Sequence, residues 1–194
     1  MARNYDVVII GAGPGGIFAA YELAKKAPEL KVAVFEAGNS LEKRKCPIDG
    51  KKIKSCINCK TCAIMSGFGG AGAFSDGKYN ITNDFGGTLY EYIGKDTAID
   101  LMKYVDEINL AYGGEGTKMY STAGTDIKKL CIQNELKLLD ASVRHLGTDI
   151  NYIVLENLYK ELKEKVEFRF NYRVDELEAV DGGYRVISGD STDE

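Results

Sequence analysis

The sequence predicts an α/β fold with a parallel sheet, and three features at its start predict it. Tyr5–Ile10 (YDVVII) is a short β-branched run of the kind that forms a strand buried on both faces. After the glycine-rich turn Gly11–Gly16, apolar residues recur at helical spacing over Ile17–Ala24, and Pro28 forbids continuation of that helix. Lys31–Phe35 (KVAVF) is a second β-type run. The order strand, helix, strand is that of a β-α-β unit.

The rest of the chain predicts further elements around a long irregular segment. Residues 37–94 show no sustained helical or strand period and are rich in Gly, Cys, Lys and Asn, and a loop of this length is usually functional. Asp96 or Thr97 is expected to cap the helix that follows. The predicted later elements are helices near 96–113, 126–134 and 149–165, strands near 136–141 and 166–172, and a β-hairpin over 173–187 that turns at 181–183.

Composition gives no general reason to expect nucleic acid or a membrane as a partner. The 194 residues are 44% hydrophobic and 28% charged, with a net charge of −4. The longest apolar runs, such as Val7–Ile10 and Ile17–Ala20, are far shorter than the roughly 20 residues that cross a bilayer. The apolar run near the N-terminus is also too short for a secretory signal, so a cytoplasmic protein is expected.

The first glycine cluster has the spacing of a dinucleotide-binding turn. In Gly11-x-Gly13-x-x-Gly16, the first glycine makes the tight turn, the second lets the main chain approach a pyrophosphate, and the third allows close packing of helix on strand. Gly15 is a further residue without a side chain, at the helix N-terminus, where the helix dipole favours binding of a phosphate. Glu36, at the end of the second strand, is placed to accept hydrogen bonds from the two hydroxyls of an adenosine ribose.

A glycine-rich turn without a ligand is the simpler alternative for such a spacing. Here the strand, the glycines, the helix, the second strand and the acid occur in the order that dinucleotide binding requires, which favours a ligand. The motif does not distinguish NAD from FAD. A carboxylate at Glu36 repels a 2′-phosphate, which disfavours NADP at this site.

Further motifs carry a resemblance to a known group of proteins. They are residues 66–78 (SGFGGAGAFSDGK), which follow Cys46-Pro47 and the triplet Cys56, Cys59 and Cys62, and residues 144–149 (RHLGTD). With the N-terminal motif, they resemble glutathione-reductase-like flavoproteins and a group of poorly characterised bacterial FAD-dependent dehydrogenases. The resemblance implies a Rossmann-like FAD/NAD(P)-binding domain over residues 1–194, with a Cys/Gly-rich insertion at 37–94. Because such flavoproteins continue well beyond this length, the chain is expected to be an N-terminal portion, incomplete at its C-terminus.

The resemblance also implies a function. It is that of an FAD-dependent oxidoreductase, which transfers a hydride or electrons to or from a small-molecule substrate or an electron carrier, with NAD(P)H as a candidate donor. Gly69 and Gly70 would lie near the flavin or pyrophosphate, and Val174 would contact adenine through its backbone. Lys78 near the flavin N1–C2 edge would favour the anionic reduced form.

Two of these positions also have simpler interpretations. Bare backbone N–H groups in residues 67–72 can lie against a flat or anionic ligand, but the segment also resembles a flexible linker. His145, the only histidine, could relay a proton to or from a bound flavin, and a purely structural histidine is the alternative.

Four of the five cysteines lie within 17 residues, at Cys46, Cys56, Cys59 and Cys62. Four thiolates could hold a zinc ion or a four-iron cluster; a redox dithiol that exchanges electrons with flavin and inert thiols are the alternatives. Cys131 is expected in the core.

The cysteines lie beside a strongly basic run. Residues 42–60 carry seven bases and two acids, a pattern typical of a solvated loop or of a surface that docks an acidic electron carrier. Nucleic acid is disfavoured because no aromatic residue lies between Lys43 and Thr61. A non-catalytic cysteine-metal binding or docking module, with a structural dinucleotide, is the second candidate function.

Overall fold

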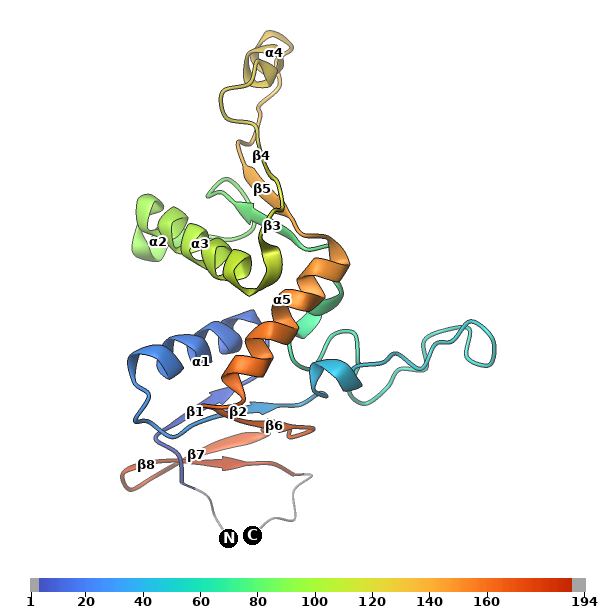
Figure 1. The fold of residues 1–194 in the computed structure, drawn as a ribbon, viewed down its shortest axis with the longest axis vertical. Coiled ribbons are helices and arrows are strands. Elements are labelled where there is room, and N and C mark those ends of the chain that lie inside the picture. Colours follow the sequence, from blue (N-terminus) through green and yellow to red (C-terminus); the bar gives the residue numbers. More distant parts are fainter. Residues whose placement is uncertain (1–3, 190–194) are drawn as a thin grey trace. The chain divides into compact units, whose positions relative to one another are not determined.

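The computed structural model describes residues 4–189, which divide into two compact units (Figure 1). Of the described residues, unit 1 contains 4–74 and 155–189, and unit 2 contains 75–154. Helix α5 (Gly147–Leu162) therefore begins in unit 2 and ends in unit 1. Among the residues described, no helix is both long enough and apolar enough to cross a membrane.

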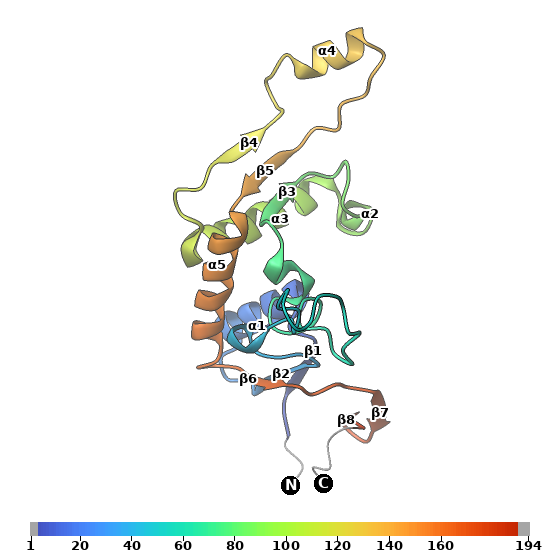
Figure 2. The same cartoon turned by 90° about the vertical axis from the view of Figure 1, so that its right-hand side faces the viewer.

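Unit 1 is built on a parallel three-stranded sheet, and the predicted α/β fold is confirmed. Its strands, in the order β1-β2-β6, are Val7–Ile10, Val32–Glu36 and Glu167–Phe170. Helix α1 (Pro14–Lys26) connects β1 to β2 and packs on both strands. Figures 1 and 2 show α1 and the end of α5 on one side of this sheet, and the hairpin of β7 (Glu176–Val180) and β8 (Gly183–Ile187) on the other.

The two predicted N-terminal strands differ in burial. Every residue of β2 is buried, because β2 lies between two neighbouring strands. β1 is only partly buried, and its last residue, Ile10, is 51% exposed. The prediction that this first run is buried on both faces is therefore wrong for the part of the chain described, in which β1 lies at the edge of the sheet.

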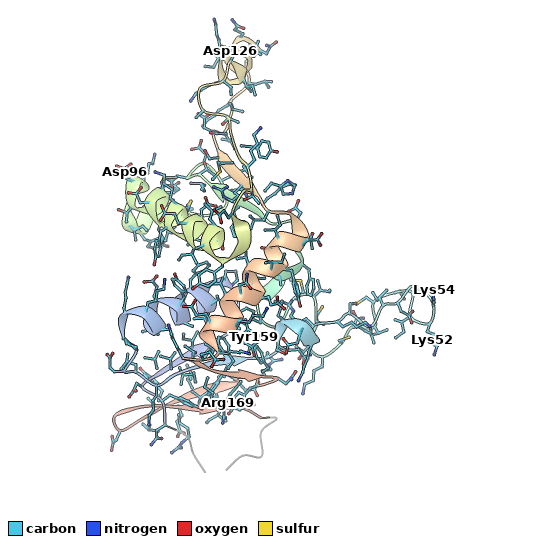
Figure 3. All side chains as sticks on the ribbon, viewed as in Figure 1. Lys52, Lys54, Asp96, Asp126, Tyr159 and Arg169 are labelled. Carbon is cyan, nitrogen blue, oxygen red and sulfur yellow. The ribbon has the colours of Figure 1, made fainter. Side chains whose placement is uncertain are left out.

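Aromatic side chains fill the space between the sheet and α5 in unit 1. Phe68 is fully buried, with its ring centroid 4.8 Å from that of Tyr159 on α5 and 5.6 Å from that of Phe168 on β6. Figure 3 shows Tyr159 on the side of α5 near the sheet. Burial of an aromatic side chain contributes about 1.5–3 kcal/mol to stability, so Phe68 fixes residues 67–72, the second glycine segment, to the core.

Unit 2 has an antiparallel sheet with helices beside it. Its strands, in the order β3-β5-β4, are Lys78–Ile81, Ser142–His145 and Met119–Ser121. Its other helices are α2 (Leu89–Ile93), α3 (Lys95–Asn109), the π-helical turn η3 (Leu110–Gly114) and α4 (Ile127–Gln133).

Several predicted elements are confirmed and others need correction. The helices near 96–113, 126–134 and 149–165, the strand near 166–172 and the hairpin are confirmed. Segment 37–94 is not wholly irregular, since it contains two 3₁₀ turns (η1, Leu41–Lys43, and η2, Gly70–Phe74) together with β3 and α2. The strand expected at 136–141 begins only at Ser142, and Gly94, not Asp96 or Thr97, caps α3.

Candidate functional site

The first glycine loop joins β1 to α1 in the geometry that the sequence predicts. Gly11 has a φ of 98°, which glycine adopts readily, and its N–H donates to the Phe35 carbonyl of β2 at 2.7 Å. A Cβ built on Gly16 would lie 1.9 Å from the Gly11 carbonyl oxygen. The main chain can therefore adopt this conformation only with glycine at both positions.

Gly13 and Gly15 are different, because nothing in the folded chain requires them to lack a side chain. A Cβ at either position would have no neighbour within 4 Å, and Gly13 has an ordinary φ of −74°. Gly13 is the N-cap of α1, where no side chain caps the helix and the first turn carries no acid, while Lys25 and Lys26 lie in the last turn. The open N-terminus of α1 can thus bind an anionic group such as a diphosphate.

Glu36, predicted to bind a ribose, organises the loops around this helix end. It is buried, and its carboxylate accepts hydrogen bonds from the N–H groups of Ala12 at 2.7 Å and of Gly38 and Gly67 at 2.8 Å. A carboxylate has about four acceptor positions, so room for a further donor remains. Binding of a ribose by Glu36 stays a prediction.

The second glycine segment lies against the first. The Gly69 N–H donates to the Ala12 carbonyl at 2.8 Å, and a Cβ on Gly70 would lie 3.2 Å from Gly13 Cα. The structure therefore brings the predicted residues Gly69 and Gly70 together with Gly11, Gly13 and Glu36. The alternative of a flexible linker does not fit, because Phe68 of this segment is fully buried.

Arg44 holds the second glycine segment in place, a role that the sequence analysis missed. Its buried guanidinium donates to four carbonyl oxygens at 2.6–2.9 Å and stacks on the Phe74 ring, 4.8 Å from the centroid. Burial lowers the pKa of Arg44, and the negative charge of Glu36 opposes that effect. The carbonyl acceptors belong to Ala63, Ile64, Phe68 and Gly70.

No sequence signal distinguishes Arg44 within the basic run of residues 43–45. In the structure it is the C-cap residue of the turn η1 and has an extended backbone.

In unit 2, the structure brings the two predicted catalytic residues together. Lys78 on β3 and His145 on β5 are register partners in the antiparallel ladder. Both are exposed, and Lys78 forms an ion pair with Asp76 at 2.5 Å. The hydrogen bond from Lys78 holds the pKa of the Asp76 carboxyl below its usual range. Lys78, Asp76 and His145 thus form an exposed polar cluster, whose catalytic role stays a prediction.

Val174 is not in a strand. It lies half-buried in the connection between β6 and β7, because β6 ends at Phe170 and β7 starts at Glu176. The adenine contact predicted for it stays a prediction.

The four clustered cysteines line one cavity of about 300 Å³ in unit 1. All are free thiols, and Cys56, Cys59 and Cys62 are exposed. Within residues 4–189, no three His, Cys, Asp or Glu side chains are arranged to hold a metal ion. Cys131 is not in a core, since α4 buries none of its residues.

Comparison with known proteins adds a family match at the N-terminus. The sequence model of the Thi4 family matches residues 2–42, which contain β1, α1 and β2. Over 33 residues the chain is 67% identical to a thiamine thiazole synthase of Yarrowia lipolytica, a stretch that is 17% of this chain and 10% of that protein. An uncharacterized protein of Clostridium beijerinckii is 31% identical over 147 residues, 75% of this chain and 24% of that protein. The chain thus spans about a quarter or less of the length of these relatives.

The similar solved structures include two oxidases. Glycine oxidase from Geobacillus kaustophilus has 16% identity and a TM-score of 0.49, with 95% of this chain and 51% of that chain covered. L-alpha-glycerophosphate oxidase from Mycoplasma pneumoniae, a structure with FAD bound, has 16% identity and a TM-score of 0.46 over 98% of this chain and 51% of that chain. The family match is therefore to the Thi4 family and lies at the start of the chain, in residues 2–42.

Proposed function

We propose that this chain is the FAD-binding part of an FAD-dependent oxidoreductase. The observation that supports it most strongly is the open, uncapped N-terminus of α1 at Gly13, in contact with the second glycine segment and close to Glu36. An anion site of this kind at the end of β1 is where dinucleotide diphosphates bind in Rossmann-like folds. FAD rather than NAD is proposed because of the resemblance carried by residues 66–78.

Each part of the site has a role in holding the cofactor. The main-chain N–H groups of Gly15 and Gly16, in the first turn of α1, would donate to the diphosphate. Glu36 would accept a hydrogen bond from the adenosine ribose with its remaining acceptor position. The main chain of Gly69 and Gly70, which carries no side chains, would lie against the cofactor. Arg44 holds this segment in place through hydrogen bonds to the carbonyl oxygens of Phe68 and Gly70.

Bound flavin supplies the chemistry, by accepting or donating a hydride or single electrons. In this proposal, Lys78 would favour the reduced flavin by its positive charge, and His145 would hold or release a proton. Their register pairing across β3 and β5 supports a joint role for them. The substrate would be a small molecule or an electron carrier, with NAD(P)H as the candidate donor.

The experiment is to purify the chain with its bound cofactor. We expect absorption bands near about 370 and 450 nm, release of FAD on heating, and anaerobic bleaching of the longer-wavelength band by NADH or NADPH. Lys78→Met should slow that bleaching by about tenfold or more, because it removes a charge that stabilises reduced flavin. Lys103→Met is the matched control, since Lys103 also forms an exposed ion pair, with Asp100.

Two results would contradict the proposal. A chain that carries no flavin, and binds none when FAD is added, is not an FAD-binding protein. Bound zinc without flavin would favour the alternative, a cysteine-metal binding or docking module. If FAD binds but the flavin is bleached at equal rates in Lys78→Met and Lys103→Met, the proposal of FAD binding is upheld. The role proposed for Lys78 is then wrong.

A further inference from the structure

The cysteine cavity lies between two stretches of one loop in unit 1, apart from the glycine loops. We define it by its lining residues, which are Cys46, Pro47 and Ile48 in the first stretch and Cys56, Ile57, Asn58, Cys59, Cys62 and Ala63 in the second. Residues 49–55 connect the two stretches. Figure 1 shows this loop extending away from the sheet of unit 1.

Apolar side chains form almost all of the cavity lining. Of the nine lining residues, only Asn58 carries an amide, and none is Lys, Arg, Asp or Glu. The four cysteines are free thiols, and a free cysteine packs like a small apolar residue. Ile57 and Ile48 are 55% and 41% exposed, so part of this apolar surface faces solvent. The cavity, of about 300 Å³, thus offers room for an apolar group.

Exposed lysines accompany the cavity along the same loop. Lys45 and Lys60 are next in sequence to lining residues. Within residues 4–189, the four lysines other than Lys43 and Lys60 have no ion-pair partner. Their positive charges are therefore available to a ligand. The six exposed lysines of residues 42–60 are Lys43, Lys45, Lys51, Lys52, Lys54 and Lys60.

The acid at the far end of the loop is used by the main chain. Asp49 Oδ1 accepts hydrogen bonds from the N–H groups of Lys51 and Lys52, each at 2.8 Å. The Ile53 N–H donates to the same oxygen at 2.9 Å, and the Ile53 carbonyl accepts the Asp49 N–H at 3.1 Å. Asp49 thus closes a turn, and Figure 3 shows Lys52 and Lys54 at this end of the loop.

An apolar cavity accompanied by exposed cations has the composition of a protein-binding surface. Protein interfaces commonly place an apolar anchor side chain in a pocket, with polar and charged residues at the rim. Residues 42–60 carry seven bases against two acids in a protein of net charge −4, so a partner that complements this loop is acidic.

Two other classes of partner fit less well. Nucleic acid is disfavoured because no aromatic residue lies between Lys43 and Thr61 to stack on bases. A segment that binds a bilayer inserts apolar residues, whereas the far end of this loop carries Lys52 and Lys54.

We propose that this loop binds an acidic segment of a partner protein. One apolar side chain of that segment enters the cysteine cavity, and its carboxylates pair with the lysines of residues 42–60. The proposal rests on the cavity and the lysines and does not depend on FAD binding.

The test measures binding of a fluorescent peptide to the full chain by fluorescence anisotropy, under reducing conditions. The peptide has a central phenylalanine with acidic residues on both sides. We expect saturable binding that weakens as the salt concentration rises, because exposed charges are screened. Alanine in place of the phenylalanine, or amides in place of the carboxylates, should each weaken binding by about tenfold or more.

One pair of variants tests the cavity. Ile57→Asp should weaken binding of the phenylalanine peptide by about tenfold or more, because it places a negative charge beside the apolar lining and near the acidic peptide. Leu130→Asp is the matched control, since Leu130 on α4 in unit 2 is also 55% exposed and lies outside the cavity. It should bind the peptide as the wild type does.

A second pair of variants tests the lysines. Combining Lys52→Gln with Lys54→Gln should weaken binding at low salt and reduce its salt dependence. Combining Lys118→Gln with Lys129→Gln makes the same change in net charge at exposed positions of unit 2. This control should bind the peptide with nearly wild-type affinity and salt dependence.

Other outcomes would overturn the proposal. These are no binding of the phenylalanine peptide, equal binding of the phenylalanine and alanine peptides, and equal binding by the two variants of either pair. Tighter binding of single-stranded RNA or of phosphatidylserine vesicles than of the peptide would assign the loop to another class of partner. Far-UV circular dichroism of each variant separates loss of binding from loss of the fold.

Discussion

The Glu36→Ala variant is expected to lose about 3 kcal/mol or more of its free energy of unfolding. The carboxylate accepts three main-chain N–H groups, from Ala12, Gly38 and Gly67, and it is only 6% exposed. A buried donor left without an acceptor costs about 1–3 kcal/mol. Because these donors lie in three different segments, their release should loosen both glycine loops together. Urea unfolding followed by circular dichroism measures the effect.

Two further variants make this result specific. Glu36→Gln keeps one acceptor oxygen and turns an amide donor toward the remaining N–H, so we expect an intermediate loss of stability. Glu29→Ala is the matched control, since Glu29 is exposed and lies in the turn that follows α1. Its effect should stay within about 0.5 kcal/mol. Equal stability of Glu36→Ala and Glu29→Ala would show that Glu36 does not organise the loops.

The Arg144→Met variant is expected to lose about 3–5 kcal/mol of stability in unit 2. The Arg144 guanidinium pairs with Asp106 of α3 through two hydrogen bonds of 2.6 and 2.8 Å and also donates to the Thr117 carbonyl at 2.7 Å. Both charged side chains are 9% exposed. The hydrogen bond to Asp106 raises the pKa of Arg144. Without Arg144, the Asp106 carboxylate stays buried with no counter-charge, and β5, which carries His145, loses its attachment to α3.

A double variant and a surface control test this explanation. Adding Asp106→Leu to Arg144→Met removes the buried, unpaired carboxylate and should recover part of the lost stability. Arg185→Met breaks the exposed pair of Arg185 with Glu178 and should cost less than about 1 kcal/mol. If the double variant is no more stable than Arg144→Met alone, the unpaired charge is not the cause of the loss.

The β-α-β start could be predicted because all of its signals are local. A β-branched run, glycines at fixed spacing, a helical period and a second apolar run follow one another within residues 5–36. The sequence alone does not predict which strands become neighbours in the sheet. β6 pairs with β2 from more than 130 residues away, and that pairing leaves β1 at the edge of the sheet described here.

Elements that depend on distant contacts were missed for the same reason. β3 and β4 are only four and three residues long, and they exist as strands because both pair with β5. Arg44 belongs to a run of bases, and only the fold shows that its guanidinium binds carbonyl oxygens of residues 63–70. Glu36 was recognised by its position after a strand, but its three main-chain donors come from loops that meet only in the folded chain.

The most direct test of the dinucleotide site is FAD affinity in the Gly13→Ala variant. A Cβ at Gly13 meets no atom within 4 Å, and the φ of −74° suits alanine, so the free protein should still fold. Because alanine is a poorer N-cap than glycine, we expect a loss of stability of about 1 kcal/mol or less. Gly183→Ala, where a Cβ is equally free of contacts, is the control. We expect wild type and Gly183→Ala to bind FAD alike and Gly13→Ala to bind about tenfold or more weakly, because the added methyl occupies the space of the diphosphate. Equal FAD affinity in all three proteins would contradict a dinucleotide site at the N-terminus of α1.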